Sequence, residues 1–111
     1  MNKIFTAIIH PNLPGGIAQN VAEKLTENTI IELRKGGKIG TEAEVSIMYH
    51  PIVQIPLAVK EVMDKAGDFE FVHLWLPNTL TLQQEYMFNS VLKLPNVSCT
   101  KYECAVTIEK K

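Results

Sequence analysis

Two short runs of almost uninterrupted apolar residues, 3–9 and 69–76, constrain this chain more than any other feature. Both are rich in β-branched or aromatic side chains and neither alternates between apolar and polar positions. A strand with that pattern is covered on both faces, which is typical of a parallel sheet with helices above and below. The two runs therefore predict a layered α/β architecture.

The segments between these runs carry helical spacing. Apolar residues recur three and four positions apart after residue 17 and again from 55 to 66, and Thr81 with Gln84 forms a capping-box pattern before a third helix. The expected strands are 3–9, 29–33, 42–49, 69–76 and 97–108, and the expected helices are 17–27, 55–66 and 82–94. We predict one Rossmann-like domain over residues 1–111, with an open, mainly parallel sheet of four or five strands flanked by three helices.

Composition excludes several classes of protein. Eleven Lys and Arg residues against twelve Asp and Glu residues leave no general cationic surface, so we expect no binding to duplex nucleic acid. The apolar runs are too short to cross a membrane, and the first residues do not resemble a signal peptide. Cys99 and Cys104 are expected to be buried, unpaired thiols, which favours a cytoplasmic location.

Ligands of open α/β sheets bind beyond the carboxyl ends of the strands, which directs attention to the loops 10–16, 34–41 and 77–81. In the first loop, Gly15 and Gly16 precede a helix and could present backbone amides to an anion, or could simply make a tight turn. His10 ends the first strand, where it could bind a ligand or act as an acid or base. Asn12 lies in the same loop and is a further candidate ligand.

The other two loops supply charge and polar groups. Arg34, Lys35 and Lys38 form the main cationic cluster, which could hold phosphates or could be a solvated turn. Asn78 and Thr79 follow the strand 69–76 and could contact a base or ribose, or could belong to an ordinary capping turn. No spacing of His and Cys indicates a metal site, no phosphate-loop motif is present, and we expect no cofactor.

Three segments resemble a known group of proteins. These are the strand end Ile9-His10-Pro11-Asn12-Leu13, the helix that starts at Pro56-Leu57-Ala58-Val59 and ends at Ala66-Gly67, and the strand Val72–Leu76 closed by Pro77-Asn78. Together they resemble the short CRISPR-associated Rossmann-like proteins of type III systems, which are related in architecture to ring nucleases and CARF sensor domains.

The resemblance implies binding of a cyclic oligoadenylate, most often the four-membered ring, in a pocket across the two-fold axis of a homodimer. It also implies metal-independent ring cleavage, for which His10 matches the histidine after the first strand, although sequestration of the intact ring is equally compatible. The leading hypothesis is a regulator that lowers the level of this messenger in antiviral signalling. The alternatives are a protein–protein interaction module and an unrelated small nucleotide-binding protein.

Overall fold

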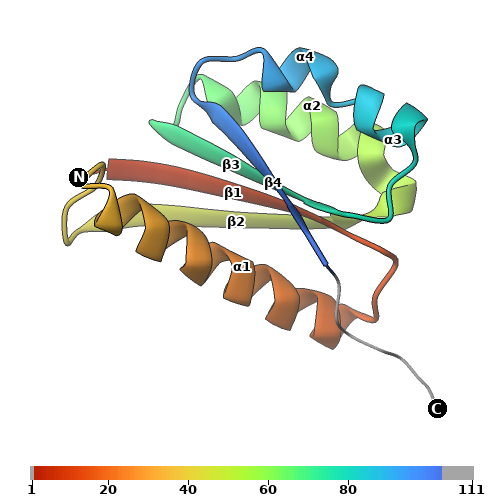
Figure 1. The fold of residues 1–111 in the computed structure, drawn as a ribbon, viewed down its shortest axis with the longest axis horizontal. Coiled ribbons are helices and arrows are strands. Elements are labelled where there is room, and N and C mark those ends of the chain that lie inside the picture. Colours follow the sequence, from red (N-terminus) through yellow and green to blue (C-terminus); the bar gives the residue numbers. More distant parts are fainter. Residues whose placement is uncertain (1, 104–111) are drawn as a thin grey trace.

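A computed structural model describes residues 2–103 as a four-stranded, fully parallel sheet with helices on both faces (Figure 1). The strand order is β2-β1-β3-β4, so β1 and β3 are the inner strands. The predicted fold class, a single open α/β sheet of the Rossmann-like type, is confirmed. The strands are β1 (Asn2–His10), β2 (Ala43–Pro51), β3 (Phe71–Pro77) and β4 (Val97–Tyr102).

Helix α1 (Gly15–Lys35) is the longest element, and it corrects one prediction. Residues 29–33 were expected to form a strand, but they continue the helix. Ala22, Leu25 and Thr29 lie on one buried stripe at helical spacing, and the Thr29 hydroxyl donates to the Leu25 carbonyl over 3.1 Å. The β-branched residues therefore follow their tertiary contacts, which outweigh a weak local preference for strand.

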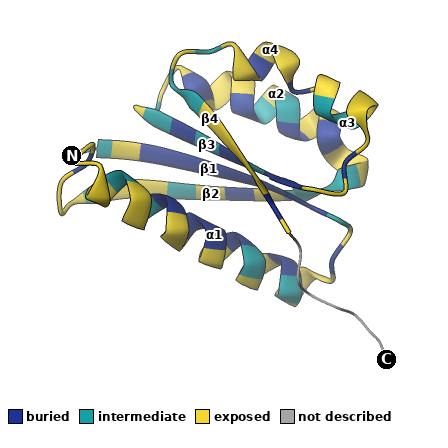
Figure 2. Ribbon diagram, viewed as in Figure 1, coloured by how far each residue is buried: buried dark blue, intermediate teal, exposed yellow. Residues whose placement is uncertain are grey.

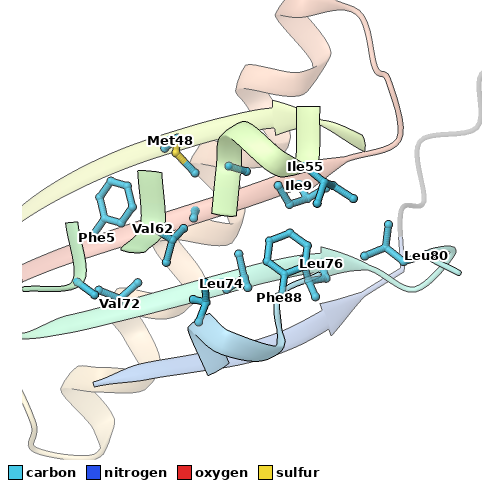
Figure 3. Packing of buried hydrophobic residues seen from close by; sticks show 14 residues of the cluster. Phe5, Ile9, Met48, Ile55, Val62, Val72, Leu74, Leu76, Leu80 and Phe88 are labelled. Atoms are coloured by element: carbon cyan, nitrogen blue, oxygen red, sulfur yellow. The ribbon is translucent and has the colours of Figure 1, made fainter. Parts of the chain in front are cut away.

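The opposite face of the sheet is covered by a short 3-10 turn (Ile52–Gln54) and by α2 (Ile55–Ala66), α3 (Leu82–Tyr86) and α4 (Asn89–Leu92). The helix predicted over 55–66 and the capping box of Thr81 and Gln84 are confirmed. The single helix expected over 82–94 is instead two short helices that break at Met87 and Phe88. The break buries the Phe88 ring completely against α2 and β3 (Figure 3).

The two faces of the sheet differ in how well they are covered. On the α2 face, side chains of β1, β2 and β3 join those of α2 and α4 in one continuous apolar cluster. On the other face, α1 alone lies across the sheet, and the apolar cluster there is small, with Ile8, Ala22, Leu25 and Tyr102 as its buried members. Figure 2 shows β1 buried along most of its length, whereas β2 at the sheet edge remains largely exposed.

Strand β4 is described as far as Tyr102, so the prediction that this strand extends to 108 falls partly outside the described residues. Tyr102 itself is buried, and its hydroxyl donates to the Ile9 carbonyl over 2.6 Å, which joins the carboxyl ends of β4 and β1. Cys99 was expected to be buried, but it is an exposed free thiol on this edge strand. Cys104 lies outside the described residues.

Candidate functional site

The order of the strands defines where a ligand would bind. From β1 the chain runs through α1 to β2 on one side, and from β3 it runs through α3 and α4 to β4 on the other side. The turns that leave β1 and β3 therefore diverge toward opposite faces of the sheet, as Figure 1 shows. In open α/β sheets this topological switch point opens a crevice at the carboxyl ends of the strands.

His10 organises the first of these two turns. Its side chain is 4% exposed, and its Nδ1 atom accepts a hydrogen bond from the Leu13 amide over 2.9 Å. Asn12, between them, has a positive φ of 55°, a left-handed conformation that asparagine adopts more easily than most residues. Because Nδ1 accepts, the proton of the neutral ring resides on Nε2. His10 thus shapes the turn that precedes α1.

The surroundings of His10 keep its ring neutral. Burial, and then the nearby charge of His50, lower the pKa of the His10 imidazole from its ordinary value. His50 is held by both ring nitrogens, with Gln54 Oε1 at 3.1 Å and Glu61 Oε1 at 2.7 Å. A neutral ring with its Nδ1 already engaged can offer one N–H donor, from Nε2.

The amino end of α1 opens at the same edge. Pro14 is the N-cap residue, no side chain caps the helix, and no acidic residue lies in its first turn. Helix amides begin to pair at Ala18, which donates to the Pro14 carbonyl over 2.8 Å, so the first-turn amides are left without partners from the helix. Unpaired amides and the positive end of the helix dipole together attract anions.

Gly15 and Gly16 contribute to this opening through their lack of a side chain. Neither has a positive φ, and a Cβ atom at either position would meet nothing within 4 Å. The tight-turn interpretation of this glycine pair therefore has no support in the backbone. The pair leaves the start of the helix uncovered.

Asn78 and Thr79 lie on the second turn, directly after β3, and both are exposed. The Asn78 amide donates to the Tyr102 carbonyl over 2.9 Å, which fixes the start of the turn against β4. The two predicted loops 10–16 and 77–81 therefore flank the switch point. On β4 nearby, Lys101 is paired with Glu85 over 2.8 Å.

The third predicted loop lies elsewhere, which corrects the expectation that all three converge. Helix α1 runs antiparallel to the strands and carries Arg34 and Lys35 back to the amino edge of the sheet, with Lys38 in the loop that follows. The Gly40 amide donates to Asn2 Oδ1 over 3.1 Å at the start of β1, and Arg34 Nη2 donates to the Thr41 carbonyl over 3.0 Å. The prediction was wrong because it rested on a strand at 29–33, whose carboxyl end would have faced the other way.

A hollow beside the edge strand was not predicted from the sequence. It is a groove of about 490 Å³ between α1 and the edge strand β2, lined by acidic and apolar residues and by Arg34. A smaller depression continues from it past Tyr49 toward the amino end of α1. The signal was present in the sequence, because Val45, Ile47 and Tyr49 alternate along β2 and Ile30 and Ile31 lie at helical spacing from Glu27.

No group of three or more His, Cys, Asp or Glu side chains within residues 2–103 could hold a metal ion. No helix among these residues has the length and apolar content needed to span a membrane.

The fold and the switch point place this protein among small parallel α/β proteins of the Rossmann-like type. Comparison of the chain with models of protein families, with curated proteins and with solved structures gives no match in any of the three.

Proposed function

We propose that this protein binds a cyclic oligoadenylate at the carboxyl edge of its sheet and lowers the free level of that messenger by sequestering it. The observation that carries the proposal is the switch point between β1 and β3, where the uncapped start of α1 and the turns of Asn12 and Asn78 lie at the same edge of the sheet. The first-turn amides would hold a phosphate, and the exposed Asn78 and Thr79 side chains would contact a base or ribose. The resemblance to type III CRISPR-associated proteins supplies the ligand class.

The state of His10 favours sequestration over cleavage. Ring cleavage without a metal needs a group that activates the 2′-hydroxyl or protonates the leaving oxygen. His10 Nδ1 already accepts from Leu13, and burial lowers the pKa of the ring, so little protonated ring is present at neutral pH to act as a general acid. A donor on Nε2 suits a role in holding the ligand.

Titration calorimetry with purified cyclic tetra-adenylate tests the proposal, followed by denaturation and chromatography of the ligand. We expect saturable binding and recovery of the intact ring. A linear or 2′,3′-cyclic-phosphate product would replace sequestration by cleavage. Absence of heat with rings of three, four and six adenylates would contradict the proposed function.

A charge placed at the start of α1 gives a sharper test. Gly16→Asp has room for its side chain and puts an anion beside the unpaired amides, so it would stabilise the helix while it repels a phosphate. We expect a higher melting temperature together with roughly tenfold weaker binding, the scale of one lost charged hydrogen bond. Asn28→Asp makes the same charge change in the middle of α1 and should leave binding unchanged.

A further inference from the structure

The edge strand β2 has features that the proposed function does not use. It is nine residues long, and the side chains of Val45, Ile47 and Tyr49 are 37%, 43% and 37% exposed on the α1 face. Natural edge strands are usually short, or carry lysines, prolines or bulges that block further pairing. Before its final proline, β2 has none of these.

The backbone of β2 also has free hydrogen-bonding groups along its outer side. The Ser46 carbonyl accepts from the Thr6 hydroxyl of β1 over 3.4 Å, so Ser46 and its alternate neighbours direct their backbone groups toward β1. By the same alternation, Val45, Ile47 and Tyr49 direct their amides and carbonyls away from the sheet. One strand thus presents an apolar row of side chains and a row of backbone donors and acceptors.

The charged residues along the groove beside β2 favour a second copy of this chain as its partner. Along the groove between α1 and β2, Glu23 and Glu27 lie toward the middle and Arg34 lies at the amino edge of the sheet. If a second copy pairs through β2 about a two-fold axis, the strands run antiparallel and Arg34 of each copy lies toward the carboxyl edge of the other, on the side of Glu23. Arg34 and Glu23 are therefore complementary in charge across the axis, a reciprocal contact of the kind that an isologous dimer makes.

The usual distances between paired strands and between packed helices agree with this dimer. Helix α1 contacts both β1 and β2, so it lies above the boundary between them. Paired strands are about 4.8 Å apart, which places the two α1 helices roughly 10 Å from each other across the junction. Helices pack at about 8–10 Å, so Ile30 and Ile31 of each copy would fill the groove of the other.

We propose that β2 pairs with β2 of a second copy to form one continuous eight-stranded sheet, closed by the packing of α1 against α1. In this dimer the carboxyl edges of the two copies face opposite directions. Each copy brings Lys35 and Lys38 beside the carboxyl edge of the other. A role for these lysines in ligand binding rests on the proposed function. Each copy would then have its own ligand site, which differs from the expectation that one ring lies across the two-fold axis.

Sedimentation of the full chain without any ligand tests the dimer independently of the proposed function. We expect the wild type to sediment at twice the 12.5 kDa chain mass and Ile47→Asp to sediment as a folded monomer. Met63→Asp changes a residue of similar exposure on the outer side of α2 and should remain dimeric. A monomeric wild type, or a dimer that Ile47→Asp leaves intact, would overturn the proposal.

A charge exchange tests the antiparallel arrangement itself. Arg34→Glu makes the groove entirely acidic, and the double variant Glu23→Arg, Glu27→Arg makes it entirely basic. Each protein alone should be monomeric, and circular dichroism would show that each is folded. An equimolar mixture should restore the dimer, because both contacts then pair opposite charges. A mixture that stays monomeric would refute the two-fold pairing of these grooves.

The contribution of the second copy to the ligand site is measured separately. Lys35→Ala combined with Lys38→Ala should weaken binding of cyclic tetra-adenylate about tenfold in the dimer and leave binding unchanged in the Ile47→Asp background. Equal effects in both backgrounds would show that the lysines act within one copy. No effect in either background would show that the two lysines do not contact the ligand. The dimer itself is tested separately by sedimentation.

Discussion

The two faces of the sheet differ in how completely helices cover them. The α2 face is covered by several helices around one apolar cluster, in which Phe88, Ile55 and Leu74 are among the fully buried side chains. The α1 face has one helix and a groove beside it, and its contacts include hydrogen bonds such as Thr6 to Thr26 at 2.7 Å. The α2 face thus stabilises the single chain, whereas the α1 face leaves the groove in which we infer that a second copy packs.

The largest effect is expected on the closed face. Phe88→Ala removes a completely buried ring between α2 and β3, and it should lower the free energy of unfolding by about 3–5 kcal/mol. Leu92→Ala, at a residue that is 40% exposed on α4, should cost at most about 0.5 kcal/mol. Denaturant unfolding measures both. Similar losses for the two variants would mean that the α2 face is not the main source of stability.

A smaller effect is expected from the polar contacts of the open face. The Thr29 hydroxyl accepts from the Trp75 indole over 2.9 Å, and Thr29→Val would leave that partly buried donor without this partner at a cost of about 1 kcal/mol. In a Trp75→Phe background the same substitution should cost much less, since no donor remains. Unfolding of the two single variants and the double variant gives the coupling. Additive losses would show that the hydrogen bond does not contribute.

The smallest effect is expected in the pH dependence of stability. Burial lowers the pKa of both His10 and His73, so the unfolded chain takes up protons near pH 6.5 that the folded chain does not. Their contribution is complete above that pH and is lost as pH falls toward the lower folded pKa values. Melting temperatures between pH 7.5 and 5 should therefore decrease with falling pH.

His10→Asn isolates one part of this effect. The asparagine Oδ1 atom can still accept from the Leu13 amide, but it does not titrate, so the decrease in melting temperature should become shallower. Adding His73→Gln should flatten it further. A slope identical to the wild type would mean that His10 does not contribute to acid sensitivity.

Much of the fold could be predicted because local patterns and tertiary contacts agree. The uninterrupted apolar runs became the two inner strands, and the helix 55–66 has the predicted boundaries. Residues 29–33 failed because their β-branched composition matched a strand while their spacing matched the stripe of α1. These residues are helical because they continue a long helix that packs on the sheet, and five residues taken alone show neither the length of that helix nor its packing.

The candidate site was predictable only in part, for a related reason. His10, Gly15 and Asn78 were located correctly because each follows a correctly predicted strand. Arg34 and Lys38 were misplaced because one misassigned strand reverses the edge at which its following loop lies. Tyr102, which holds the Ile9 carbonyl beside His10, depends on a contact between residues 93 positions apart and leaves no local signature.

Hydrogen exchange at the outer side of β2 tests most directly whether a second copy completes the open face. In an isolated chain the amides of Val45, Ile47 and Tyr49 have no strand partner and should exchange rapidly, whereas those of the inner strands remain protected. We expect these three amides to be protected at high protein concentration and to lose that protection on dilution or in Ile47→Asp. Rapid exchange at every concentration would contradict the pairing of β2.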